Sequence, residues 1–164
     1  MPHQVPGSYW LNDEIRESYG NWLSELGARV GGWDWWVTLT FRDRELEGFS
    51  RGWSKIGGHY ADKAFKSWVQ SIPNNYILNP GWRPTHLTWV RGTERTKTRE
   101  VPHFHSLIAG CKDQRRSEAW ANWFKEQGLA RIEPYDKELG AGYYLCKYAV
   151  KNLGEVEFSP GFPQ

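Results

Sequence analysis

Two histidines separated by one residue are the first feature of the sequence that could do chemistry. His103 and His105 lie in the segment 102–109 (PHFHSLIA), whose composition predicts a β-strand. Side chains of a strand alternate between its two faces, so both imidazoles point to the same face, about 7 Å apart along the strand. Such a pair can converge on one metal ion, although a single His-x-His motif is a weak signal.

Glu94 offers a third ligand for the same ion. It ends the segment 85–94, which alternates like a strand, and the charged connection 95–100 would form a hairpin to the histidine strand. An antiparallel pairing would bring Glu94 opposite the histidines. Two imidazoles and a carboxylate with open positions suit Mg²⁺, Mn²⁺, Fe²⁺ or Zn²⁺. The plainer interpretation makes Glu94 a solvated hairpin charge, and Glu100, inside the connection, is a less favoured ligand.

Tyrosines and lysines share one face of a predicted helix over residues 139–153. Tyr144, Lys147, Tyr148 and Lys151 follow one another at helical spacing. Tyrosine can act as a covalent nucleophile. Its phenol has a pKa of about 10, and a neighbouring ammonium group favours the phenolate. The alternative is an amphipathic helix that simply faces solvent.

Basic residues gather around the predicted hairpin. The net charge is only +2, so binding to a nucleic acid would depend on a local patch of cations. The candidates for contacts with DNA phosphates are Arg91, Arg95, Lys97, Arg99, Lys151 and Arg42. A solvated hairpin with no ligand is the competing interpretation.

The elements that must position these residues indicate an α+β fold. The predicted helices cover residues 12–26, 59–72, 117–127 and 139–153, and the predicted strands cover residues 35–41, 85–94, 102–109 and 130–135. Two strands joined by a hairpin, with helices on either side, favour an antiparallel sheet flanked by helices. The 164 residues suit a single domain, with a core over about 35–153 and loose tails at 1–9 and 154–164.

The composition adds two expectations. Eleven tryptophans exceed what a core of this size requires, so they indicate either dense packing or rings that stack on bases, with Trp82 and Trp89 as guesses. The two cysteines form no disulfide framework, the start has no secretory signal, and no apolar stretch could span a bilayer. We therefore expect a soluble protein of the cytoplasm with no membrane partner.

Taken in order, these segments resemble the motifs of the HUH superfamily of replication initiators. Thr38–Phe41 is similar to the first motif of that superfamily. Glu94 and Val101–Ile108 resemble its metal motif, and Gly142–Lys151 resembles its tyrosine motif. The spacing Tyr-x-x-Lys-Tyr-x-x-Lys is closest to initiators of small single-stranded DNA phages and some plasmids. The resemblance covers about residues 35–153.

The resemblance implies a ferredoxin-like or palm-like fold and a nuclease that nicks and joins single-stranded DNA. His103, His105 and Glu94 would hold Mg²⁺ or Mn²⁺. Tyr144 would be the primary nucleophile, with Tyr148 as a possible second one, and Lys147 would contact the scissile phosphate or a neighbouring water. The implied role is rolling-circle initiation with a separate host or viral helicase, in the cytoplasm or, for a virus of eukaryotes, the nucleus.

Three other functions are open on the sequence. An HUH transposase or relaxase shares the histidine motif, but a relaxase usually has three histidines and an N-terminal tyrosine. A cupin-type Fe²⁺ oxygenase also uses two histidines and a glutamate, yet its glutamate usually follows the histidines, where this chain has no acid. A non-catalytic nucleic-acid-binding module would explain the aromatic residues but leaves the histidine motif as coincidence.

Overall fold

The sheet is antiparallel throughout and joins strands that are distant in the sequence. The computed structural model describes residues 13–42, 58–73, 87–95, 102–140 and 156–160. The elements are α1 (Asp13–Arg29), β1 (Trp35–Leu39), α2 (Gly58–Ser71), β2 (Thr88–Arg95), β3 (Pro102–Ala109), α3 (Arg116–Glu126), β4 (Ala130–Pro134) and β5 (Val156–Phe158). The strand order is β4-β1-β3-β2-β5. The predicted α+β class, with an antiparallel sheet flanked by helices, is therefore confirmed.

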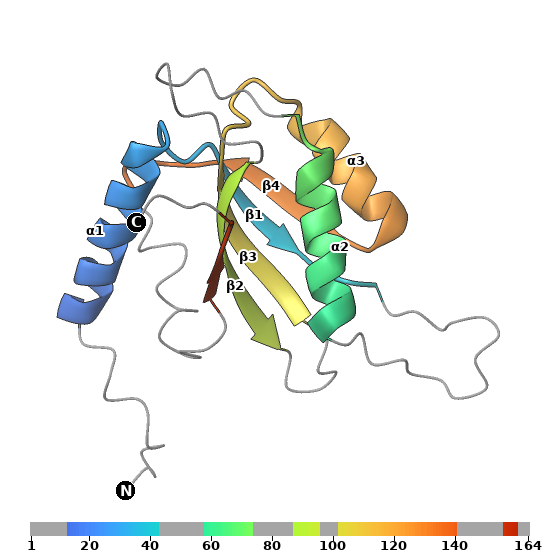
Figure 1. Ribbon diagram of the computed structural model, residues 1–164, viewed down its shortest axis with the longest axis horizontal. Coiled ribbons are helices and arrows are strands. Elements are labelled where there is room, and N and C mark those ends of the chain that lie inside the picture. The colour runs from blue at the N-terminus through green and yellow to red at the C-terminus, as the bar shows by residue number, and fades with distance from the viewer. Residues whose placement is uncertain (1–12, 43–57, 74–86, 96–101, 141–155, 161–164) are drawn as a thin grey trace, which may run out of the picture.

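The helices divide between the two faces of the sheet. In Figure 1, α2 and α3 lie on one side and α1 lies on the other. Phe104 and Ile108 of β3 belong to the cluster that α2 and α3 cover, whereas Leu107 and Ala109 belong to the cluster beneath α1. The alternation of side chains along β3 thus supplies two separate cores.

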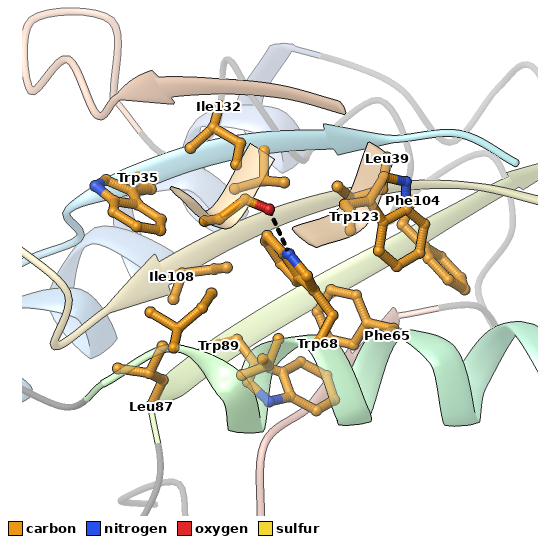
Figure 2. Packing of buried hydrophobic residues seen from close by; sticks show 14 of the residues in the cluster. Trp35, Leu39, Phe65, Trp68, Leu87, Trp89, Phe104, Ile108, Trp123 and Ile132 are labelled. Atoms are coloured by element: carbon orange, nitrogen blue, oxygen red, sulfur yellow. Dashed lines mark hydrogen bonds between the residues drawn. The ribbon is translucent and has the colours of Figure 1, made fainter. Parts of the chain in front are cut away.

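Aromatic rings fill the larger of these cores. Figure 2 shows Trp68 of α2 and Trp123 of α3 against Phe104 and Ile108 of the sheet. Trp68 Nε1 donates a hydrogen bond of 2.9 Å to the carbonyl of Ala119, which satisfies its only donor inside the core. The expectation of dense aromatic packing is confirmed for this face.

The smaller core holds α1 against the opposite face. Leu23 and Val30 of α1 pack with Val90 and Leu107 of the sheet. Trp33, just after the helix, packs into the same cluster and donates from Nε1 to the Leu23 carbonyl at 3.0 Å. These residues cover one end of the face, so α1 leaves the end that carries His103 and Glu94 outside its core.

Four predictions about the elements and rings need correction or lie outside the described residues. The tail 154–164 is not wholly loose, because β5 pairs with β2; a three-residue strand is too short to stand out in a sequence. Trp89 is a core residue and not a base-stacking candidate. Trp82 is not among the described residues. The predicted helix 139–153 lies outside the described residues beyond residue 140. None of the helices in the described part of the chain is long and apolar enough to cross a membrane.

Candidate functional site

The strand register brings the predicted metal ligands to one place. β2 and β3 pair antiparallel, with Glu94 opposite His103 and Gly92 opposite His105. Directly opposite residues share a face of the sheet, so Glu94 and both histidines lie on the same face. The predicted placement of Glu94 opposite the histidines across the β2–β3 pair is confirmed.

Glu94 contacts the histidine diagonal to it. Its Oε2 lies 3.3 Å from Nε2 of His105, and the two side chains are 33% and 10% exposed. Gly92, which pairs with His105, has no side chain beside the imidazole, so the carboxylate can reach across that position. The outcome is a carboxylate and an imidazole nitrogen facing each other at the partly open end of the sheet.

Strand β1 fixes the orientation of the His105 ring. Thr38 pairs with His105 in the register of β1 and β3, and its Oγ1 lies 3.3 Å from Nδ1. The indole of Trp36 stacks on the imidazole, with centroids 5.8 Å apart and an angle of 20° between the planes. A ring held from its edge and from its face keeps Nε2 pointing at Glu94.

This orientation determines what the pair can bind. When Nδ1 carries the hydrogen, it donates to Thr38, and Nε2 presents a lone pair to the Glu94 carboxylate. Two lone pairs facing each other at 3.3 Å repel unless a cation lies between them. A proton or a metal ion can fill that role.

The spacing is compatible with a divalent metal ion. Nitrogen and oxygen ligands lie about 2.0–2.2 Å from such an ion, so two adjacent ligands are about 3 Å apart. The distance between Glu94 and His105 is close to that value. However, no three His, Cys, Asp or Glu side chains converge tightly enough to hold an ion in the part of the chain that is described. His103 shares the face with Glu94 and His105.

The predicted nucleophiles belong to a part of the chain outside the described residues. The segment 141–155, which contains Tyr144, Lys147, Tyr148 and Lys151, lies outside the described residues, as do Lys97 and Arg99. Arg95 is the last described residue of β2, and only its backbone is described.

Arg91 is located differently from the prediction. It pairs with Ser106 and so faces α2, on the side of the sheet opposite Glu94. Its guanidinium donates to Asp62 and Glu157 at 2.9 Å each and lies 4.3 Å from the centre of the Phe104 ring. With only 3% of the residue exposed, it has no access to DNA phosphates beside the predicted metal ligands. Arg91 and Glu94 are an odd number of residues apart, a signal in the sequence that places them on opposite faces.

Arg42 interacts with helix α3. Its Nη2 donates to the Phe124 carbonyl, and its guanidinium lies 5.1 Å from the centre of the Phe124 ring. This contact joins the end of β1 to α3. The residues that sequence reasoning missed are Trp36 and Thr38, because their contact with His105 depends on a long-range strand register; the likeness of Thr38–Phe41 to a known motif was the available signal.

Comparison with known protein families identifies the class. The sequence profile of the replication-associated protein ORF2/G2P family matches residues 34–153, which is well over half of the chain. The chain belongs to this family of replication-associated proteins. The matched range contains Glu94, both histidines of β3 and Tyr144. Comparisons with curated proteins and with solved structures gave no match.

Proposed function

We propose that this replication-associated protein is a metal-dependent endonuclease that nicks and rejoins single-stranded DNA at a replication origin. The observation that carries the proposal is the 3.3 Å approach of Glu94 to an imidazole that Thr38 and Trp36 hold in place. With Nδ1 directed at a hydroxyl, Nε2 faces a carboxylate and is available to a cation that the two groups share. Membership of a replication-associated family makes DNA the natural substrate.

Mg²⁺ or Mn²⁺ is the ion proposed for the site. Glu94 and His105 would hold it, with His103 as the third ligand from the same face. When bound, the ion would polarise a non-bridging oxygen of the scissile phosphate. Thr38 would keep the proton of His105 on Nδ1, so that Nε2 remains a ligand.

Tyr144 is the proposed nucleophile. Its phenolate oxygen forms a bond to the phosphorus while the bond from phosphorus to the 3′ oxygen breaks, and the departing 3′ oxygen takes up a proton. Lys147 would favour the phenolate before attack. The 5′ phosphate stays on the tyrosine, and a 3′-hydroxyl can later attack it and release the phenol. Tyr148 could accept the strand in a second round. The reaction uses single strands, so a separate helicase would have to open a duplex origin.

A covalent adduct tests the proposal. The protein is incubated with Mn²⁺ and a pool of labelled single-stranded oligonucleotides that includes origin-like hairpins, and an adduct that resists denaturation is sought. We expect Tyr144→Phe, His105→Ala and a chelator to abolish the adduct. His59→Ala is the matched control, because His59 is exposed on α2, which packs on the opposite face of the sheet.

Each outcome has a distinct meaning. Adduct that persists in Tyr144→Phe but disappears when Tyr148 is also replaced would show that both phenols react. Binding to single strands with no adduct under any condition would reject the nuclease and favour a non-catalytic binding module. An adduct on a preferred hairpin that transfers to a second DNA would instead leave a transposase as the alternative to an initiator.

A further inference from the structure

Two large rings on α3 are exposed although the protein has a core that could bury them. Trp120 and Phe124 are 40% and 43% exposed, one helical turn apart. Their rings stack with centroids 4.9 Å apart and only 9° between the planes. Aromatic pairs in the core on this side of the sheet are edge-on, as between Phe41 and Trp123, or tilted, as between Phe65 and Trp68. The parallel arrangement therefore distinguishes this exposed pair.

Cationic groups lie at both ends of the pair. The guanidinium of Arg42 lies over the Phe124 ring and donates to the Phe124 carbonyl. Arg116 lies one turn before Trp120 on the same face of α3, and its Nη1 donates to the Ile132 carbonyl at 3.2 Å. A guanidinium has five N–H donors, so each arginine can also bind an anion. We call the row Arg116, Trp120, Phe124 and Arg42 the α3 stack.

The two acidic residues of α3, Glu118 and Glu126, each lie two positions from a residue of this row and so point to other sides of the helix. Glu118 forms a 3.7 Å ion pair with Arg115 and is well exposed. Two positions after Arg116 and two before Trp120, it points to a different side of the helix. The exposed surface of the stack therefore combines flat rings with positive charge at each end.

Single-stranded nucleic acid matches this chemistry. Proteins bind it by stacking bases on aromatic side chains while cations contact the phosphates. A duplex would keep its bases stacked on each other, out of reach of an isolated ring. A protein partner would match the rings, but it would not by itself require arginines at both ends of the row.

The α3 stack also lies within reach of the candidate site. Arg42 follows Thr38, whose hydroxyl contacts His105, by four residues of nearly extended chain. That segment spans at most about 14 Å. A strand whose phosphate lies near His105 could reach the stack within a few nucleotides.

We propose that the α3 stack binds bases of single-stranded DNA that flank the scissile phosphate. A base stacks on the surface of Trp120 that Phe124 does not cover, and Arg42 and Arg116 contact the adjoining phosphates. The proposal rests on the proposed function for the choice of a DNA strand. It adds a second binding surface, on the α3 side of the sheet, to the nicking site on the other.

Binding without metal tests the stack separately from cleavage. The dissociation constant for a fluorescein-labelled single-stranded oligonucleotide of mixed sequence is measured by fluorescence anisotropy in the presence of a chelator. We expect Trp120→Ala to weaken binding about tenfold, and Arg42→Ala to reduce the slope of log affinity against log salt by about 0.7. Trp22→Ala is the matched control, because Trp22 is 41% exposed on α1; it should change the affinity less than twofold.

Photocrosslinking provides a direct readout on the folded wild-type protein. Oligonucleotides that carry 5-iodouracil are crosslinked and the protein is digested with trypsin. The crosslink should map to Ser117–Lys125, the tryptic peptide that contains Trp120 and Phe124. Crosslinks confined to other peptides, or equal affinities of Trp120→Ala and wild type, would overturn the proposal.

Three further outcomes separate the alternatives. A wild-type dimer that becomes monomeric in Trp120→Ala, with unchanged DNA affinity, would assign the stack to a second copy of the chain and reject a DNA site. Loss of DNA affinity in Trp120→Ala without any covalent adduct in the wild type would retain the stack but reject the nuclease. An adduct that forms normally, with no effect of Trp120→Ala on binding, would reject the stack alone.

Discussion

Replacing Thr38 by valine should weaken metal binding without unfolding the protein. The change keeps the shape of the side chain and removes the hydroxyl that lies 3.3 Å from Nδ1 of His105. Residues that orient metal-binding histidines contribute about 10–100-fold to metal affinity. The 3.3 Å distance is long for a hydrogen bond, and Trp36 still stacks on the ring. We therefore expect the low end of the range, about tenfold or 1.4 kcal/mol.

The measurement is a calorimetric titration of the whole protein with Mn²⁺, alongside its urea denaturation. The free energy of unfolding should change by about 1 kcal/mol or less, since one partly buried hydrogen bond is lost. Thr40→Val is the control. Thr40 is near Thr38 in the same segment, and its hydroxyl bonds to the carbonyl of Leu129 and not to a histidine. Its Mn²⁺ affinity should equal that of the wild type.

The results distinguish an error about the role of Thr38 from an error about the metal site itself. If Thr38→Val binds Mn²⁺ as tightly as wild type while His105→Ala does not bind it, Thr38 does not orient the ligand. If wild type and His105→Ala bind Mn²⁺ equally, the site formed by Glu94 and His105 is not the metal site. In that case the cation between their lone pairs is a proton.

Three further predictions concern stability and reactivity. Arg91→Met should lower the free energy of unfolding by about 2–3 kcal/mol in urea denaturation. This is less than the roughly 3–5 kcal/mol typical of a broken buried pair, because the carboxylate partners of Arg91 are partly exposed. No loss would mean that the aromatic rings around Arg91 stabilise this part of the core without its ion pairs. Gly128→Ala should cost about 1–3 kcal/mol, seen as a lower Tm, because its Cβ would lie 2.4 Å from the carbonyl oxygen of Thr40; an unchanged Tm would contradict this close approach. Burial and, secondarily, the charge of Asp34 raise the pKa of Cys111 well above its ordinary value. A Cys146→Ser variant is treated with a thiol reagent at about pH 8.5, where an unfolded thiol is about half ionised. The Cys111 thiol should react only after denaturant is added. Rapid reaction of the native protein would refute the burial and the raised pKa of Cys111.

The placement of the two histidines and Glu94 could be predicted from the sequence, because it depends on residues that are close together in the chain. Period-two alternation places His103 and His105 on one face, and the antiparallel pairing of β2 with β3 brings Glu94 beside them. Both rules operate over a short stretch of chain. The same alternation also puts Arg91 on the other face of the sheet. The sequence therefore already contained the evidence against grouping Arg91 with the DNA-binding residues beside Glu94.

The part that depends on long-range register could not be predicted. Thr38 and Trp36 reach His105 only because β1 lies next to β3, a pairing between segments far apart in the chain. β5 escaped notice because its three residues find their partner on β2. For the aromatic residues, Trp89 is buried and Trp120 exposed because of how the helices pack on the sheet, and composition contains no such information.

The alternation along β3 also separates stability from chemistry. Phe104 and Ile108 anchor the core under α2 and α3, while the intervening His105 faces Glu94. A histidine on the same strand as two fully packed core residues has little freedom to move its backbone, so its direction is set by the sheet. Substituting the histidine should therefore remove function at small cost in stability. Substituting Phe104 by alanine should instead cost about 3–5 kcal/mol and disturb the site only through loss of the fold.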